Sequence, residues 1–251
     1  MNKLQLTLQK SKRLGVIAVV PAGTPDLALT IEIILTLAAT DISGVQLNLP
    51  FSDSVAGGAV LEKADMCALA SGYTTDALFN MLAELRKKCS LTITLSCYAN
   101  AIYAYGAEQF FSNCHACSIS GVLVFDIPLE ERNEFAIYST KYNIDLLTDI
   151  AATDAARVAQ LAACGTGYIN LLALDKGEEA LRNTIDIIKK HTNLPVLLDI
   201  AVLEKHKNLF SCINFVHTGT ALVQIITQHG KDAPKYIYKY IAKIMEMLKT
   251  C

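Results

Sequence analysis

Side chains that could perform acid–base or binding chemistry recur directly after short apolar segments of the chain. These residues are Gln46, Asn48, Tyr98, Asn100, Asp126, Asp149, Asn170, Asp199, His217, Thr218 and Thr220. Carboxylates and imidazoles can transfer protons, whereas amides and hydroxyls can hold a substrate through hydrogen bonds. If the apolar segments are strands of one parallel barrel, these side chains meet at the carboxyl ends of its strands, where active sites form.

Some of these positions also have simpler structural explanations. Asp126, in Asp126-Ile127-Pro128, could be a catalytic acid, but the sequence favours a cap on the next helix. His217 alone is most often a core histidine with satisfied hydrogen bonds, and a ligand or a base is the alternative. Thr218-Gly219-Thr220 precedes a helical segment, so it suits either a phosphate-binding turn or a plain helix cap at one of the threonines.

Short β-branched apolar segments alternate with longer segments of helical period along the chain. The predicted strands are Val16–Val20, Gly44–Leu49, Leu91–Cys97, Gly121–Asp126, Ile144–Asp149, Tyr168–Leu172, Pro195–Ile200 and Cys212–Val216. The predicted helices are Pro25–Ala39 with a cap-like Thr24-Pro25 pair, Thr74–Lys88, Ala107–Cys114, Leu129–Tyr142, Thr153–Cys164, Glu178–His191, Val202–Leu209 and Ala233–Leu248.

This alternation predicts a parallel sheet, and eight such units in 251 residues predict a (β/α)8 TIM barrel that forms a single domain over residues 1–251. We also expect an extra N-terminal helix and an extra helical segment, Leu61–Ala70, after the second strand. A doubly wound open sheet is the alternative. It is less favoured because Gly23 stands alone after the first strand, where a dinucleotide fold needs Gly-x-Gly-x-x-Gly.

Composition narrows the class of protein. Lys and Arg number 22 against 24 Asp and Glu, so no excess of positive charge favours nucleic-acid binding. Hydrophobic residues make up 52% and charged residues 18%, which excludes a disordered chain. The charge-free runs Cys89–Ala107 and Gln109–Phe125 contain too many polar residues for a membrane span, and the N-terminal segment lacks a signal-peptide core. We therefore expect a cytoplasmic protein.

The chain has eight cysteines, including the pair Cys114 and Cys117 in CxxC spacing. A zinc site would need a second set of ligands at matching spacing, and the sequence has no second CxxC. Without a secretory signal, a disulfide framework is not expected either. The cysteines are therefore predicted to be reduced, partly buried thiols, and no metal site is predicted.

Several segments, in sequence order, resemble the tryptophan synthase α chain family. The most specific is Gln46–Gly58, QLNLPFSDSVAGG, which is similar to the family's E-L-G-x-P-F-S-D-P-x-A-D-G. Tyr98–Asn100, Val122–Glu131, Gly167–Leu172 and Gly219–Val223 resemble the family's segments at the third, fourth, sixth and eighth strands. Because the matches run in order over most of the chain, it is identified as a member of that family.

The resemblance implies an enzyme that splits indole-3-glycerol phosphate into indole and glyceraldehyde 3-phosphate. In the family, a Glu at the end of strand two moves protons, an Asp in the next loop pairs with the indole N–H, and Gly-rich turns after strands seven and eight hold the phosphate. For this chain the resemblance implies substrate contacts at Tyr98, Asn100, Gly219 and Thr220. It also implies a β chain carrying pyridoxal phosphate (PLP) as partner in an α2β2 assembly, with no cofactor in this chain.

The chain departs from the family at the residues that do chemistry. Gln46 stands at the position of the family's Glu, and Gly57 at the position of its Asp. Asp199-Ile200-Ala201-Val202 replaces the Gly-rich turn after strand seven, and the lid segment Ala173–Ala180 is short. Because an amide cannot accept and return a proton in this chemistry, we expect the chain's own lyase activity to be lost or very weak.

The loop Pro50-Phe51-Ser52-Asp53 keeps the family pattern, and in the family it faces the β chain. Asp53 is then either a contact across the interface or a residue that stabilises the turn. This selective loss predicts a non-catalytic α-chain-like subunit that binds the β chain and activates it. The alternatives are a working lyase that uses Asp126, Asp149 or Asp199, a barrel enzyme for another small phosphate ester, and a relic that is only structurally stable.

Overall fold

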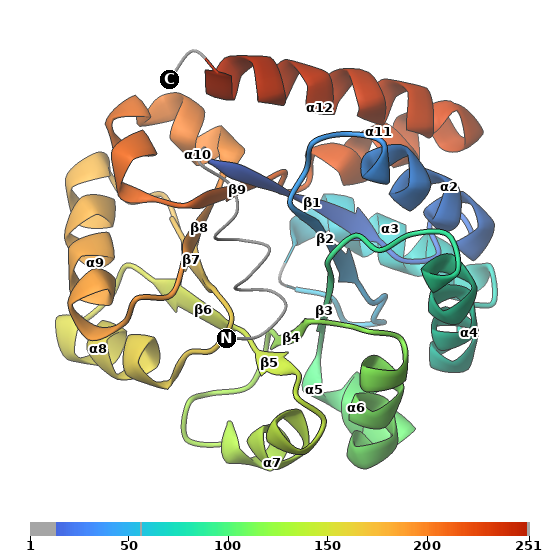
Figure 1. Cartoon of the computed structure of the whole chain (residues 1–251), viewed down its shortest axis with the longest axis horizontal. Helices are drawn as coiled ribbons and strands as arrows, with labels where there is room; N and C mark the ends of the chain where they lie inside the picture. The colour runs from blue at the N-terminus through green and yellow to red at the C-terminus, as the bar shows by residue number, and fades with distance from the viewer. Residues whose placement is uncertain (1–13, 56, 250–251) are drawn as a thin grey trace.

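The computed structural model describes residues 14–55 and 57–249. Its sheet contains the strands β1 (Gly15–Pro21), β2 (Gly44–Asn48), β3 (Ile93–Cys97), β4 (Gly121–Val124), β5 (Asp145–Leu146), β6 (Thr148–Ala151), β7 (Ile169–Leu172), β8 (Val196–Asp199) and β9 (Phe215–His217). The strand order is β5-β4-β3-β2-β1-β9-β8-β7-β6, and every pair of neighbours is parallel. The strands curl into a nearly closed barrel, as Figure 1 shows, which confirms the predicted TIM barrel.

The predicted fifth strand is divided at Leu147 into β5 and β6. β5 pairs with β4, and β6 pairs with β7. The guanidinium of Arg132 donates hydrogen bonds to the carbonyl oxygens of Leu146 and Leu147. The hydroxyl of Thr166 also donates to the carbonyl of Leu146, at 2.9 Å. Side chains therefore take up the backbone acceptors at the point where the ladder is interrupted.

Helices surround the barrel in the expected alternation. They are α2 (Leu27–Ala38), α3 (Gly58–Ala70), α4 (Thr75–Arg86), α5 (Ala99–Tyr105), α6 (Ala107–Ala116), α7 (Asn133–Lys141), α8 (Ala155–Cys164), α9 (Glu178–His191), α10 (Ile200–Lys205), α11 (Ala221–His229) and α12 (Ala233–Lys249), with 3-10 turns η1 (Lys207–Cys212) and η2 (Gly230–Asp232). The extra helical segment after the second strand is α3. The predicted N-terminal helix lies outside the described residues.

Two details of the predicted helices are wrong. The Thr24-Pro25 pair does not cap α2, because Oδ1 of Asp26 accepts the hydrogen bond from the backbone N–H of Leu29 at 2.8 Å. The predicted helix Val202–Leu209 is instead the short helix α10 followed by the 3-10 turn η1. In contrast, the ends of α9 agree with the prediction. Glu178 and Glu179 open this helix and Lys189 and Lys190 close it, in accord with the helix dipole.

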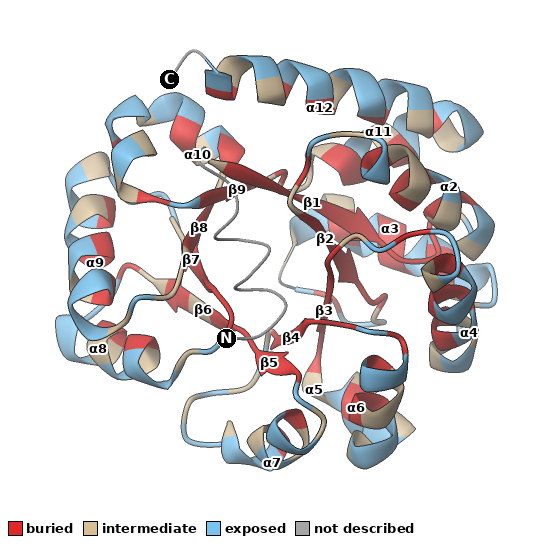
Figure 2. Ribbon diagram, viewed as in Figure 1, coloured by how far each residue is buried: buried red, intermediate tan, exposed pale blue. Residues whose placement is uncertain are grey.

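Apolar side chains fill both faces of the sheet. Figure 2 shows the strands mostly buried and the outer faces of the helices exposed. Inside the barrel, one buried layer consists of Ile17, Leu123, Leu147, Tyr168, Leu197 and Phe215. The thiols of Cys114 and Cys117 are buried and free, in agreement with the prediction. Among the residues described, no helix is long and apolar enough to cross a membrane.

A single arginine ties α4 to the amino-terminal side of the barrel. Arg86 donates to the carbonyl oxygens of Cys117 at 2.8 Å, Leu91 at 2.5 Å and Ser118 at 3.0 Å. Burial lowers the pKa of this guanidinium because it withdraws the charged group from water. The three carbonyl oxygens replace hydrogen bonds that water would otherwise accept. Arg86 therefore links the end of α4 to the start of β3 and the end of α6.

Replacing this arginine should destabilise the fold. Arg86→Met is expected to lower the free energy of unfolding by about 2 kcal/mol, because it removes three charge-assisted hydrogen bonds to carbonyls. Urea unfolding followed by circular dichroism measures the change. Lys87→Met is the matched control, since the neighbouring Lys87 only pairs with Glu84 on the surface. Equal stability of the two variants would contradict this role.

Candidate functional site at the mouth of the barrel

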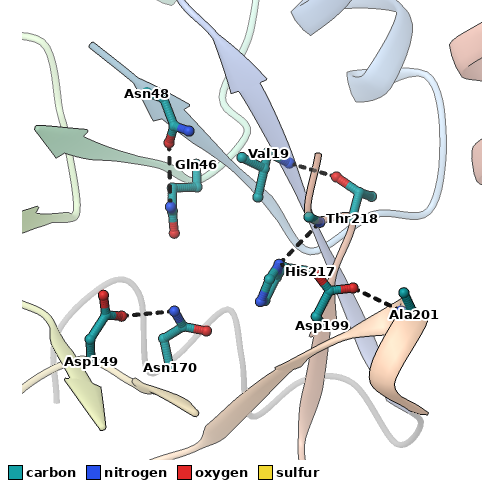
Figure 3. Close-up of polar contacts among 10 residues, drawn as sticks. Val19, Gln46, Asn48, Asp149, Asn170, Asp199, Ala201, His217 and Thr218 are labelled. Atoms are coloured by element: carbon teal, nitrogen blue, oxygen red, sulfur yellow. Dashed lines mark hydrogen bonds and ion pairs between the residues drawn. The ribbon is translucent and has the colours of Figure 1, made fainter. Parts of the chain in front are cut away.

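A polar layer lies directly above the apolar layer inside the barrel. Along a strand, residues two positions apart point to the same face. Asp149, Asn170, Asp199 and His217 each follow a member of the apolar layer by two positions, at Leu147, Tyr168, Leu197 and Phe215 respectively. They therefore point into the barrel near the carboxyl ends of its strands, as Figure 3 shows. The sequence prediction that these side chains converge is confirmed for this set.

Gln46 is held by hydrogen bonds at both ends of its amide. Its Nε2 donates to Ser96 Oγ at 3.2 Å and to Asn48 Oδ1 at 3.4 Å, and its Oε1 accepts the hydroxyl proton of Tyr168 at 2.9 Å. The Oγ of Ser96 also donates to Asn48 Oδ1. Gln46 is buried, so this closed network is what satisfies its polar atoms. The arrangement fixes the side chain but supplies no group that can exchange a proton with a ligand.

Asp149 is a carboxyl of the layer with altered acidity. Burial raises its pKa to about 6, and a hydrogen bond from Asn170 Nδ2 to its Oδ1, at 2.7 Å, opposes the rise. Oδ1 of Asn170 has no hydrogen-bond partner among the described residues. A carboxyl with a pKa near neutrality is suited to accept a proton and return it. Asp149 is therefore the one candidate base that this layer provides.

The turn after β9 is covered by a carboxylate. Gly219 has a φ of 51°, and a Cβ placed on it would lie 2.2 Å from Asp199 Oδ2. Asp199 Oδ1 accepts the backbone N–H of Ala201 at 2.8 Å and so caps α10. The side chain of Asp199 thus lies against the turn that was predicted as a phosphate cradle. At 4 Å, a second negative charge here would be repelled by about 4 kcal/mol at an effective dielectric near 20.

His217 uses the backbone donor of the same turn. Its Nδ1 accepts the N–H of Gly219 at 3.1 Å, so this nitrogen carries no proton in that arrangement. Burial lowers the pKa of the imidazole, and Asp199, with Oδ2 at 4.0 Å from Nδ1, opposes this only partly. His217 is therefore neutral. The predicted core histidine with satisfied hydrogen bonds agrees with this geometry better than a base does.

Thr220 is the N-cap residue of α11, as one alternative predicted, but neither threonine gives this helix a side-chain cap hydrogen bond. Oγ1 of Thr218 accepts the N–H of Val19 at 2.9 Å, across the barrel wall on β1, and not a donor of α11. Thr220 stands at the start of α11 but makes no side-chain cap hydrogen bond. Thr218 therefore fastens β9 to β1, and the amino end of α11 has no side-chain acceptor from either threonine.

Asp126 is a cap, but of a different helix from the one predicted. Its Oδ1 accepts the N–H of Ala99, the first residue of α5, at 2.7 Å. Asn100 lies in the first turn of this helix and is exposed. The substrate-binding roles of Tyr98 and Asn100 stay predictions. In the structure these residues form the junction between β3 and α5, beside the polar layer rather than within it.

Tyr98 holds the loop after β2. Its hydroxyl accepts the N–H of Val55 at 2.7 Å, and its ring stacks on Phe51 with centroids 4.7 Å apart. Ser52 and Asp53 are exposed on the loop and share a hydrogen bond from Ser52 Oγ to Asp53 Oδ2, at 2.6 Å. This hydrogen bond joins two side chains of the loop and leaves the carboxylate of Asp53 exposed, so both sequence interpretations of Asp53 stay predictions.

A buried acid lies beneath the same loop. Asp65 of α3 is only 2% exposed. Burial raises its pKa to about 6, against the opposing effects of Ser54 and the N–H of Phe51. Gly57, at the start of α3, has no room for a side chain, since a Cβ there would lie 2.4 Å from Leu61 Cδ2. Leu61 therefore occupies the space next to the backbone where the family has an aspartate.

A cavity of about 310 Å³ opens beside the polar layer, between the loop after β7 and α10. Its lining includes Asp199 and His217 of the polar layer and the two lysines Lys176 and Lys205. The sequence analysis did not single out either lysine as a binding residue. Lys176 follows the predicted strand Tyr168–Leu172, and Lys205 lies near the start of the predicted helix Val202–Leu209. The described residues contain no group of three or more His, Cys, Asp or Glu side chains that could hold a metal ion.

Comparison with known proteins places this geometry in a family. The family model described as tryptophan synthase alpha chain matches residues 6–251. The tryptophan synthase alpha chain of Alkaliphilus metalliredigens is 28% identical over 98% of this chain and 96% of its own length. That of Buchnera aphidicola subsp. Baizongia pistaciae is 30% identical over 90% of this chain and 88% of its own.

Solved structures agree with this placement. A mutant tryptophan synthase alpha-subunit from Pyrococcus furiosus superimposes with a TM-score of 0.85, at 26% identity, over 94% of this chain and 99% of its own. A chain from a structure titled for the mutual activation of the Pyrococcus furiosus tryptophan synthase α2β2 complex gives a TM-score of 0.83, at 27% identity, over 91% of this chain and 96% of its own.

The raised pKa of Asp149 makes stability depend on pH. Between about pH 4 and pH 6 the folded state keeps a proton that the unfolded state releases, so the stability from this group is present at low pH and lost as pH rises through that window. Asp149→Asn cannot ionise, so it removes this loss of stability at higher pH. Its amide also offers an N–H to the unpartnered Oδ1 of Asn170. We expect the variant to be about 3 kcal/mol more stable than the parent at pH 7.

Urea unfolding at pH 4 and pH 7 measures this effect. The gain should be present at pH 7 and shrink toward zero at pH 4. Asp41→Asn, at an exposed turn residue, is the control and should show no such dependence. A gain of the same size at both pH values would mean that the proton on Asp149 is not its cause.

Proposed function

Since this chain belongs to the tryptophan synthase alpha chain family, we propose that it is an α-type subunit that binds and activates the PLP-dependent β chain without cleaving indole-3-glycerol phosphate itself. The observation that carries this proposal is the carboxylate of Asp199, which lies on the Gly219 turn where the family resemblance implies the phosphate. PLP belongs to the partner, and we expect no cofactor in this chain and a cytoplasmic location.

The position of the family's proton-transfer group supports lost catalysis. Gln46 stands there, and both ends of its amide are engaged by Ser96, Asn48 and Tyr168. General acid–base catalysis is typically worth about 10²–10⁴-fold, so the substitution alone removes most of the rate. A second loss adds to it, since Leu61 fills the space that a side chain at Gly57 would need.

The β2 loop supports a retained docking function. Asp53 and Val55 are exposed, and Val55 is 83% exposed despite being apolar. Tyr98 holds the backbone of Val55, so this surface is presented in a defined conformation. A bound partner that covers this loop would bury the Val55 side chain, which removes apolar surface from water and so favours binding. The related Pyrococcus furiosus protein is described in an α2β2 complex with mutual activation, which is consistent with such a role.

Activation does not require catalysis by this chain. A subunit shifts a two-state partner toward its active state if it binds that state more tightly than the other one. A coupling of about 1–3 kcal/mol, or about 5–150-fold in affinity, is typical of such effects. The loop after strand β2 of this chain needs only to distinguish two arrangements of the partner β chain. None of the residues that hold this loop belongs to the polar layer.

One observation favours a second candidate function, an active lyase that uses substitute residues. The pKa of Asp149 near 6 is suited to a general base, and its side chain faces the barrel interior. Asp126 and Asp199 are less suited, because their carboxylates cap α5 and α10. The proposed function and this candidate differ in one measurable quantity, the release of indole by the purified chain.

The first test measures the β reaction. Adding this chain to the β chain of the same organism should increase the rate of tryptophan formation from indole and serine in a saturable way. Asp53→Ala should raise the concentration of this chain that gives half of the maximal increase by roughly tenfold, or about 1.4 kcal/mol in binding free energy. The variant removes an exposed charge of the proposed docking loop. Asp186→Ala, at an exposed position of α9, is the matched control and should change nothing.

Two results would overturn the proposed function. One is the absence of both complex formation and rate change with the β chain. The other is indole release from indole-3-glycerol phosphate that Asp149→Asn abolishes, since this would assign the chain an active lyase site.

The second test asks whether the lost residues can be restored. Gln46→Glu combined with Gly57→Asp should remain a poor lyase, because Asp199 still covers the phosphate turn and Leu61 obstructs position 57. Adding Asp199→Gly should increase kcat/KM at least tenfold over the double variant by removing the repulsion. Indole release at limiting substrate measures both variants. Robust activity of the double variant alone would show that Asp199 does not block the phosphate.

A further inference from the structure

The cavity between the loop after β7 and α10 is lined by charged residues of both signs. Its volume of about 310 Å³ lies at the lower end of the range for small-molecule pockets, so it suits a small ligand. Two lysines and two aspartates line it, Lys176, Lys205, Asp175 and Asp199. Their formal charges cancel, which favours a ligand with no net charge over an anion such as a phosphate ester.

The positive groups lie on the loop and on the helix. Lys176 belongs to the loop after β7, and Lys205 is the last residue of α10. Neither ammonium group has an acidic partner within 4 Å in the part of the chain that the structure describes. His206, the next lining residue, instead lies 3.8 Å from Glu178 Oε2. The two lysines are therefore available to a carboxylate.

One of the two carboxylates, that of Asp199, has an oxygen without a hydrogen-bond donor among the described residues. Asp199 Oδ1 is occupied by the N–H of Ala201, but no hydrogen-bond donor reaches Oδ2 from the residues described. His217, 4.0 Å away, cannot supply a proton there, because its Nδ1 already accepts from Gly219. Figure 3 shows the carboxylate between His217 and the start of α10. Oδ2 of this partly buried carboxylate is therefore free to accept a hydrogen bond from a cationic donor of a ligand.

The remaining lining is aliphatic. Leu172 and Leu174 contribute from the end of β7 and its loop, and Val202 contributes from α10. Leu174 is 62% exposed, so an apolar ligand would cover a side chain that now faces water. The cavity thus combines the unpaired oxygen of Asp199, a second carboxylate at Asp175, two ammonium groups and an apolar wall.

We propose that this cavity binds a free α-amino acid with an aliphatic side chain. Its ammonium group contacts Oδ2 of Asp199, its carboxylate lies between Lys176 and Lys205, and its side chain packs on Leu172, Leu174 and Val202. A phosphate ester is disfavoured because Asp199 repels it. A simple amine leaves the two lysines without a counter-ion. The proposal is independent of docking to the β chain, so its failure would leave the β-chain assay unaffected.

Calorimetric titration of the full chain tests the proposal with four probes of matched structure. L-leucine carries both charged groups, 2-hydroxy-4-methylpentanoate lacks the ammonium, 3-methylbutylamine lacks the carboxylate, and inorganic phosphate lacks the side chain. L-leucine should bind at least about tenfold more tightly than each of the other three, since each lost charge-assisted hydrogen bond reduces affinity by about that factor.

Variants then assign the two ends of the ligand. Asp199→Asn can still cap α10, so the fold is retained while the anion is lost. It should weaken L-leucine at least about tenfold and leave the hydroxy acid unchanged or tighter. Lys205→Met should weaken both L-leucine and the hydroxy acid. Lys235→Met, at an exposed position of α12, is the matched control and should affect neither.

Any of three results would overturn the proposal. They are the absence of L-leucine binding at millimolar concentration, equal affinity for L-leucine and the hydroxy acid, and tighter binding of phosphate than of L-leucine by the parent protein.

Discussion

The two-residue period of the parallel strands governs the rest of this structure. Once Leu147, Tyr168, Leu197 and Phe215 fill the barrel interior, the residues two positions later must face the same interior, nearer the mouth. The chain has no freedom to turn Asp149, Asn170, Asp199 or His217 to another surface without a slip in register. The hydrogen bonds of this one fixed layer of polar side chains therefore decide which of its groups are free to act on a ligand.

The polar atoms of this layer and of Gln46 are largely satisfied by neighbouring groups of the protein. The amide of Gln46 is held by Ser96, Asn48 and Tyr168, the imidazole of His217 takes the N–H of Gly219, and Oδ1 of Asp199 takes the N–H of Ala201. Buried polar groups that are hydrogen-bonded to each other stabilise a fold but are poorly placed to act on a ligand. The atoms left over, Oδ1 of Asn170 and Oδ2 of Asp199, are where a ligand could still gain hydrogen bonds.

The parts that could be predicted from the sequence are those set by local pattern. The β-branched runs predict the strands, and the acidic start and basic end of Glu178–His191 predict the bounds of α9. The residues that the prediction missed depend on contacts distant in sequence. The short helix α5 has no side-chain cap of its own, since the acceptor comes from Asp126, 27 residues away. The cavity lysines belong to a loop and a helix end that meet only when the barrel closes.

The anchoring of the β2 loop explains how catalysis could be lost while docking is kept. Tyr98 holds this loop from the end of β3, Asp126 holds the start of α5 next to it, and Asp65 supports the loop from beneath. The contacts by which they hold the loop and the start of α5 are made to Val55, Ala99 and the Phe51–Ser54 turn, and not to Gln46, Asp149 or Asp199. Because energetic coupling is strongest between groups that touch or share partners, changes in the polar layer leave the loop's own supports intact. The barrel therefore allows its interior and the loop after β2, which is the proposed docking surface, to diverge separately.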